Sequence, residues 1–265
     1  PNVTFWKRVF AVFDSNSGLL HDTEDVTLVY HIWHNDLPTD PPLRQGIIDE
    51  ARSRYRAILE TLADGKGLYL TSDEERVWTM FKGKQHALAF RAAANNIRFQ
   101  GGMRSRFAQG LVRSWMYLPE IERIFANAGL PAELTLLPHI ESSFENRALS
   151  KVGAAGIWQI MPATGRRFLR VTDDVDERLN ISASTMAAAQ ILRENYTMLG
   201  TWPLAITAYN HGANGMKQAV ATVGTTDFGV IVQRYHGPLF GFASQNFYAE
   251  FLAAIDLVQN YKHYF

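Results

Sequence analysis

Residues 141–165 have the sequence ESSFENRALSKVGAAGIWQIMPATG, and this stretch decides which fold and which function we expect. It places an acidic residue, Glu141, directly before small and polar residues, and a run of glycine and alanine follows at residues 153–156. Small residues beside an acid allow a ligand to approach the backbone closely. The stretch therefore indicates a ligand site around Glu141.

The residues before this stretch indicate an unusual environment for the acid. We expect a helix to begin at Pro131, and one of its faces carries Leu134, Leu137, Glu141 and Phe144. Burial among apolar side chains raises a carboxyl pKa, so that Glu141 stays a proton donor near neutral pH, as a glycosidic leaving group requires. In the alternative interpretation Glu141 reaches water from the end of its helix or pairs with Arg147.

Two motifs resemble the lytic transglycosylases of family 1. Residues 141–165 match the family's pattern of Glu-Ser, a Ser nine residues further on, Gly-Ala-x-Gly and Gln-x-Met-Pro, and the Trp before Gln159 is most similar to the membrane-bound type D branch. The second motif, Ala208-Tyr209-Asn210 followed by Gly212 and Gly215, resembles the family's Ala-Tyr-Asn-x-Gly. The resemblance covers residues 130–260 and is more specific than one short motif.

The resemblance implies a mainly α, lysozyme-like catalytic domain of the goose-type lysozyme/SLT kind, in which Glu141 is the catalytic acid and base. It implies substrate contacts from Ser150, Gln159, Met161, Tyr209 and Asn210. Each of these has an ordinary alternative role, such as a helix N-cap for Ser150, a satisfied polar group for Gln159, and core packing for Met161.

The sequence offers no clear second acid, although ordinary glycosidases use two carboxyl groups. Glu145 follows where the helix is expected to end, and we expect a solvated loop at Asp173, Asp174, Asp176 and Glu177. The resemblance implies a reaction that one acid can perform. Glu141 protonates the oxygen of the bond between N-acetylmuramic acid and N-acetylglucosamine, and then deprotonates the C6 hydroxyl of the same muramic acid. No cofactor and no metal are expected.

Composition excludes several other functions. Apolar residues make up 47% and charged residues 20%, as in a soluble globular protein, and the 26 basic residues equal the 26 acidic ones, which gives no reason to expect a nucleic-acid partner. Without cysteine, the His139-Ile140-Glu141 match to half of a zinc deaminase site fails. The glycines at 212 and 215 lack the basic context of a KH loop, so we interpret them as a turn.

Hydrophobic spacing and breaks predict the organisation of the chain. Helices are expected over residues 5–13, 41–62, 72–81, 86–97 and 107–125, and an extended segment over residues 26–33. The pair Gly101-Gly102 marks a boundary. We therefore expect residues 1–105 to form a mostly helical region that packs on the catalytic domain, and residues 106–265 to form the lytic transglycosylase domain. Neither a membrane span nor an export signal is predicted.

The expected function is that of a monomeric peptidoglycan lytic transglycosylase in the periplasm or cell envelope of a bacterium, with any membrane anchor outside this chain. Two alternatives stay open. One is a lysozyme-like hydrolase, in which water replaces the C6 hydroxyl, and the other is a non-catalytic glycan-binding protein, which would not need a buried acid. Where many family members carry an acid shortly before the Tyr of the last helix, this chain has Ser244-Gln245-Asn246-Phe247-Tyr248.

Overall fold

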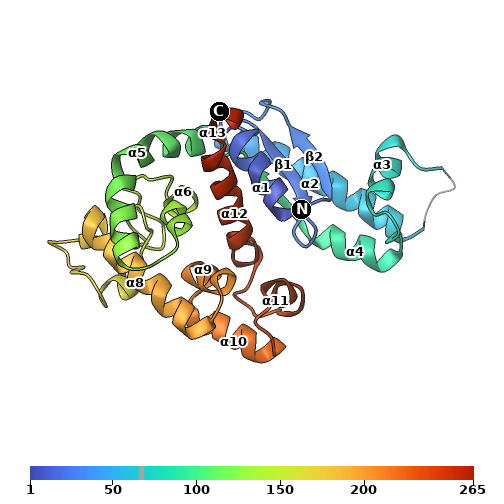
Figure 1. The fold of residues 1–265 in the computed structure, drawn as a ribbon. Coiled ribbons are helices and arrows are strands. Elements are labelled where there is room, and N and C mark those ends of the chain that lie inside the picture. Colours follow the sequence, from blue (N-terminus) through green and yellow to red (C-terminus); the bar gives the residue numbers. More distant parts are fainter. Residues whose placement is uncertain (66–68) are drawn as a thin grey trace. The chain divides into compact units, whose positions relative to one another are not determined.

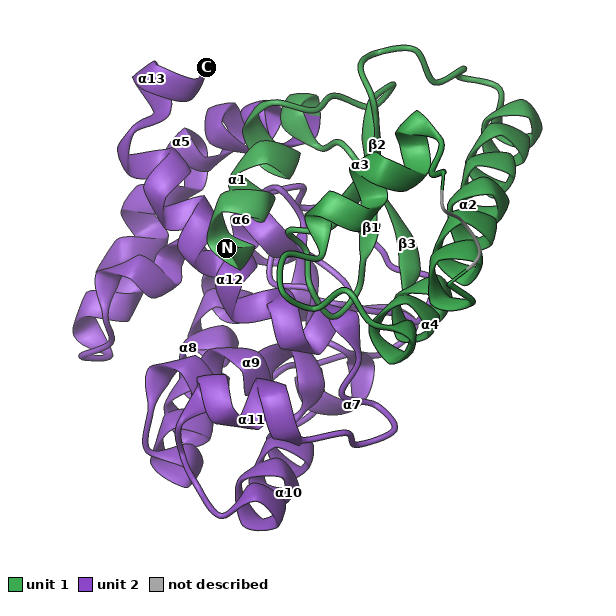
Figure 2. Ribbon diagram, turned by 90° about the vertical axis from the view of Figure 1, so that its right-hand side faces the viewer, with its two compact units in different colours: residues 1–105 green, residues 106–265 purple. Residues whose placement is uncertain are grey.

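A computed structural model describes residues 1–65 and 69–265 and divides the chain into two compact units. Figure 2 shows the first unit, residues 1–105, and the second unit, residues 106–265. Helices dominate, so the prediction of a mainly α architecture is confirmed (Figure 1). Among the helices described in these two ranges, none has the length and hydropathy needed to cross a membrane.

Within its described residues, 1–65 and 69–105, the first unit combines four helices with a three-stranded antiparallel sheet. The strands β1 (Gly18–Asp22), β2 (Val29–Trp33) and β3 (Ile97–Gly101) lie in the order β2-β1-β3. The helices are α1 (Asn2–Ala11), α2 (Pro41–Ala63), α3 (Ser72–Met80) and α4 (Ala87–Asn95). Every residue of β1 is buried, so the central strand contributes to the core of this unit on both faces.

Local capping explains where the helices of the first unit begin. The side chain of Asp40 accepts a hydrogen bond from the backbone of Leu43 at the start of α2, and Thr71 and Glu74 form a capping box at the start of α3. The predicted helix over 86–97 is too long, because α4 ends at Asn95 and Ile97 opens β3. Strand β1 was not predicted, since a five-residue buried strand has no alternation to reveal it.

The second unit is built from helices and short helical turns. Its elements are α5 (Arg104–Asn127), η1 (Ala132–Leu136), α6 (Pro138–Glu141), α7 (Pro162–Gly165), η2 (Glu177–Leu179), α8 (Ile181–Leu199), α9 (Trp202–His211), α10 (Ala213–Val223), α11 (Phe228–Arg234), α12 (Phe242–Gln259) and α13 (Tyr261–Tyr264). Helix α9 packs against α8, α10 and α12 (Figure 1). Residues far apart in the sequence thereby meet around α9.

Trp158 occupies the core of the second unit. Its ring is fully buried and stacks on Phe125, with the ring centroids 5.4 Å apart and an interplanar angle of 10°. Its Nε1 donates a 2.9 Å hydrogen bond to Oγ1 of Thr185 on α8, so the polar edge of the ring is satisfied inside the core. Residues 141–165, which carry the first sequence motif, are therefore anchored in the core through Trp158.

The single helix predicted from Pro131 is wrong. A 3₁₀ turn, η1, is followed by the four-residue helix α6, because Pro138 has no backbone N–H to continue the earlier hydrogen-bond ladder. Beyond α6, Ser143 and Phe144 adopt left-handed backbone conformations with φ of 53° and 55°. Phe144 is nevertheless fully buried, so apolar packing offsets the cost of that conformation.

Candidate active site

Glu141 ends α6 and keeps part of its surface accessible. Its carboxyl group forms no hydrogen bond or ion pair within the described part of the chain, and the pairing with Arg147 that we considered is not found there. The surrounding protein removes water from the carboxyl group, and the negative charge of Glu250 adds to this effect, so that the pKa of Glu141 rises to about 8. Glu141 is therefore mostly protonated at neutral pH.

Tyr209 of α9 lies close to this carboxyl group. Its hydroxyl donates a 2.7 Å hydrogen bond to the backbone carbonyl of Trp158. Burial first, and the nearby charge of Glu141 second, raise the pKa of Tyr209 well above its ordinary value. The phenol therefore stays neutral at every physiological pH, and the structure brings together two of the residues that the sequence motifs singled out.

Glu250 is a site residue that sequence analysis missed. It lies on α12, which packs against α6, and it is partly buried. The resemblance suggested an acid before Tyr248, whereas the first acid of this helix comes two residues after it. The available signal was the position of Glu250 between Phe247 and Phe251, because an acid on a largely apolar helix face is a candidate for a functional role.

Side-chain donors fix three consecutive backbone carbonyls in the segment after Glu141. Ser142 Oγ donates to the carbonyl of Ile157 at 2.8 Å, and Tyr209 donates to that of Trp158. The Nε2 of Gln159 donates to Gly156 at 2.8 Å, and also to Ala148 at 3.3 Å. The amide nitrogen of Gln159 thus bonds within its own loop, and the amide oxygen is the group that can accept a hydrogen bond from a substrate.

Ser150 stabilises a turn rather than a helix N-terminus. Its hydroxyl oxygen accepts a 2.8 Å hydrogen bond from the backbone of Ala154, and its own backbone N–H donates to the carbonyl of Ala154, also at 2.8 Å. The hydroxyl proton can still be donated to a ligand. Met161 follows this segment as the N-cap of α7 and is 41% exposed, so it is a surface residue and not core.

Asn210 is exposed, and its Oδ1 accepts a 3.2 Å hydrogen bond from Oγ of Ser244. The same hydroxyl lies 3.2 Å from Nδ1 of His211. Ser244 is buried at the place where the resemblance led us to look for an acid, and it connects α12 to α9 there. Asn210 therefore bonds to α12, whereas Tyr209 beside it is directed to Glu141 and Trp158.

The remaining acids of this region have structural partners. Glu145 forms an ion pair with Arg113 at 3.3 Å. Two of the four acids in the predicted solvated loop also form ion pairs, Asp176 with the buried Arg178 at 2.7 Å and Glu177 with Arg170 at 2.8 Å. Within residues 1–65 and 69–265, no group of three His, Asp or Glu side chains could hold a metal ion.

Residues 121–231, which include Glu141 and Tyr209, match the family model described as the transglycosylase SLT domain. These residues, fewer than half of the chain, are similar to SLT domains. A membrane-bound lytic murein transglycosylase D from Escherichia coli (strain K12) is 38% identical over 141 residues, which are 51% of this chain and 30% of that protein. The present chain thus spans about a third of the length of that relative.

Two further proteins are similar to this chain. A putative tributyltin chloride resistance protein from Alteromonas sp. (strain M-1) is 33% identical over 113 residues, covering 42% of this chain and 55% of that protein. An inactive mutant of the lytic transglycosylase Slt from Pseudomonas aeruginosa aligns with a TM-score of 0.46 and 17% identity, over 83% of this chain and 34% of that one.

Proposed function

We propose that the chain is a peptidoglycan lytic transglycosylase that acts on glycan strands in the periplasm or elsewhere in the bacterial cell envelope. The observation that carries the proposal is the carboxyl group of Glu141, whose pKa is raised to about 8 inside an SLT domain. The E. coli relative named for murein transglycosylase activity supports the same substrate. All groups involved come from one chain, so the proposal needs only a monomer.

The chemistry requires a proton donor that becomes a base within one turnover. Glu141 donates its proton to the glycosidic oxygen as the bond from that oxygen to C1 of N-acetylmuramic acid breaks. The resulting carboxylate then takes the proton of the C6 hydroxyl while O6 bonds to C1, giving a 1,6-anhydro product without consuming water. An internal hydroxyl in good orientation can lower the barrier by about 7–11 kcal/mol.

The other site residues bind and orient the substrate. Three side chains of residues 141–165 contact the sugars on either side of the cleaved bond, namely Ser150, Gln159 and Met161. Tyr209 and Asn210 complete the site at the end of α9. The lysozyme-like fold of the catalytic unit belongs to the same proposal.

The decisive experiment is digestion of purified peptidoglycan by the wild type and by Glu141→Gln, with mass spectrometry of the released muropeptides. The wild type should release anhydro-muropeptides, and the variant should be slower by a factor of at least about 10². Glu145→Gln is the matched control, because this acid lies four residues away and pairs with Arg113. Equal activity of wild type and Glu141→Gln would contradict the proposed role of Glu141.

Glu250 favours one second candidate, a lysozyme-like hydrolase. A hydrolase needs a second carboxylate to activate water or to form an intermediate, and the charge of Glu250 acts on Glu141. Products with reducing ends, lost in Glu250→Gln, would identify a hydrolase. Release of no product by the wild type from peptidoglycan, while it still binds the strands, would favour a non-catalytic glycan-binding protein.

A further inference from the structure

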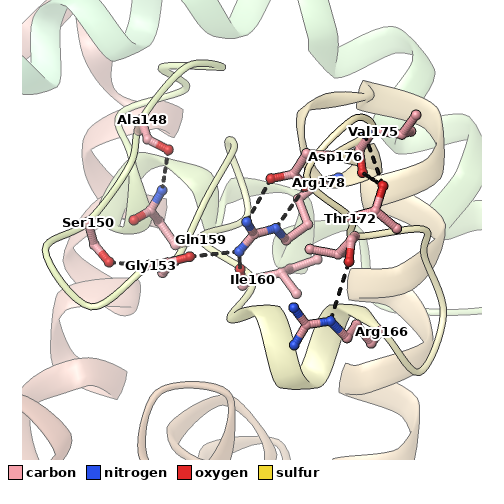
Figure 3. Close-up of polar contacts among 12 residues, drawn as sticks. Ala148, Ser150, Gly153, Gln159, Ile160, Arg166, Thr172, Val175, Asp176 and Arg178 are labelled. Carbon is pink, nitrogen blue, oxygen red and sulfur yellow. Dashed lines mark hydrogen bonds and ion pairs between the residues drawn. The ribbon is translucent and has the colours of Figure 1, made fainter.

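A buried arginine ties together the two ends of the segment that carries Gln159. Arg178 of η2 is only 6% exposed. Its Nη1 donates hydrogen bonds to the carbonyl of Gly153 at 2.7 Å and to that of Ile160 at 3.0 Å (Figure 3). One guanidinium group therefore fixes the distance between the turn that contains Ser150 and the backbone beside Gln159.

Asp176 fixes the orientation of this guanidinium group. Its Oδ1 accepts from Nε of Arg178 at 2.8 Å, and its Oδ2 accepts from Nη2 at 2.7 Å, which is a two-bond contact (Figure 3). Such a pair holds the plane of the guanidinium as well as its position. The remaining nitrogen, Nη1, is thereby directed to the two carbonyls.

The backbone of Arg178 also contacts the segment. Gly156 has a φ of 76°, and a Cβ atom at this position would lie 2.1 Å from the carbonyl oxygen of Arg178. Only glycine fits there, because a side chain would both clash with that oxygen and strain the backbone. Residues 153–160 therefore contact Arg178 at both ends and in the middle.

The opposite edge of the same segment contacts the elements around the catalytic glutamate. Ser142, the neighbour of Glu141, donates to the carbonyl of Ile157, and Tyr209 donates to that of Trp158. The segment is thus held from the Glu141 side by two hydroxyl groups and from the other side by Arg178. Its position relative to Glu141 depends on both sets of contacts.

We propose that Arg178, oriented by Asp176, is a positioning residue of the active site, which holds residues 153–160 so that Gln159 and Ser150 meet the glycan strand. This inference rests on the proposed function. It assigns a role to Arg178 and to Asp176, one of the acids of the loop that the sequence had indicated to be solvated. Loss of the guanidinium leaves the chain folded around Trp158 but displaces the two substrate-contacting side chains.

The variant that tests this role is Arg178→Lys. Lysine keeps the positive charge but lacks the planar fork, so it cannot bond to Asp176 and to both carbonyls at once. Binding is measured in the Glu141→Gln background with soluble glycan strands stripped of peptides. We expect the dissociation constant to rise about tenfold or more, which corresponds to about 1.4 kcal/mol of lost contact. Turnover of peptidoglycan should fall as well.

Two controls separate positioning from general loss of stability. Arg166→Lys alters an arginine of the neighbouring turn, whose Nε donates to the carbonyl of Val171 at 3.3 Å (Figure 3). Ile231→Ala removes a fully buried side chain on α11 and should cost about 2–5 kcal/mol of stability. All variants are compared at a temperature at which circular dichroism shows each of them to be folded. Both controls should keep the wild-type dissociation constant.

A mutant cycle on a variant that combines Ser150→Ala with Gln159→Ala gives the sharpest result. If Arg178 acts through these two side chains, adding Arg178→Lys to that variant should cause little further loss of binding. Additive losses, or an Arg178→Lys variant that binds as well as Ile231→Ala, would contradict the inference alone. A wild type that releases no muropeptide would contradict the proposed function first. Should Arg178→Lys not fold, Asp176→Asn weakens the same contact and enters the same cycle, with the same expected losses.

Discussion

The hydroxyl group of Tyr209 donates a 2.7 Å hydrogen bond to the carbonyl oxygen of Trp158. This bond joins α9 to a segment whose central indole ring is buried in the core. It also holds the phenol beside Glu141, whose charge contributes to the raised pKa of Tyr209. One hydroxyl group therefore connects the core, the segment proposed to contact the substrate and the proposed catalytic acid.

Tyr209→Phe should lower both stability and activity. The carbonyl of Trp158 loses its side-chain donor, which costs about 1–3 kcal/mol when the group stays buried. The segment after Glu141 also loses one of its contacts, so we expect activity on peptidoglycan to fall by about tenfold or more. Urea unfolding and muropeptide release measure the two effects.

Tyr196→Phe is the matched control for this change. Tyr196 is 40% exposed and stacks on Trp202 with the ring centroids 4.4 Å apart, and the phenylalanine ring preserves that contact. Its effect should stay within about 0.5 kcal/mol. Equal losses in the two variants would show that the Trp158 hydrogen bond has no special importance.

Glu250→Gln should shift the pH profile of activity. Desolvation first, and the charge of Glu250 second, raise the pKa of Glu141 to about 8, so removal of that charge lowers the pKa. Glu141 then loses its proton at a lower pH, and the basic limb of the pH–rate profile moves to lower pH. The ratio of the rate at pH 8 to that at pH 6 should therefore fall. Glu122→Gln on the exposed face of α5 changes the net charge equally and should leave the limb in place.

The sequence alone predicted the parts of the structure that local chemistry determines. Helix α2 could be placed because Pro41 and Gly65 bracket a regular apolar spacing. Glu141 could be singled out because an acid among small residues and glycines departs from ordinary core composition. These features depend on neighbours in the sequence, so they are visible without a structure.

The contacts that complete the site could not be predicted in this way. The charge of Glu250 acts on Glu141 only because α12 packs against α6, across more than a hundred residues of sequence. Arg178 follows an acidic loop, and its sequence neighbours predict an exposed residue. It is nevertheless buried, and its guanidinium group donates to the carbonyls of Gly153 and Ile160. Pro138 was a local signal that we did not weigh, and it splits the predicted helix into η1 and α6.

Glu141→Gln should change how stability depends on pH. The pKa of Glu141 is about 8 in the folded chain and 4.5 in the unfolded chain, so the folded state binds more protons between these values. The free energy of unfolding of the wild type should therefore fall as pH rises from about 4.5 to 8. Glutamine cannot ionise, so the variant should lose less stability over this range. Urea unfolding at pH 5 and pH 8 measures the difference, and equal slopes would contradict the raised pKa.

His139→Phe should remove a loss of stability at acidic pH. His139 stacks on Phe107 at 5.1 Å and meets Phe144 at 4.7 Å, and within the described chain its two ring nitrogens have no hydrogen-bond partner. Burial lowers its pKa from 6.5 to about 3, so between these pH values the unfolded chain binds a proton that the folded chain does not bind. The stability of the wild type should thus fall as pH drops below about 6.5.

Between pH 4.5 and 6.5, Glu141 and His139 change the stability of the folded chain in opposite directions as pH rises. The effect of His139→Phe is therefore measured in the Glu141→Gln background. There, His139→Phe should alter stability at pH 7 by no more than about 1–2 kcal/mol, since it exchanges unpaired nitrogens for a slightly larger ring. At pH 4 the phenylalanine variant should gain a further difference on the order of 3 kcal/mol. His236→Gln, at an exposed position, should show no such gain. If the pH 7 and pH 4 differences for His139→Phe are equal, the histidine reaches solvent and is not enclosed between the two phenylalanine rings.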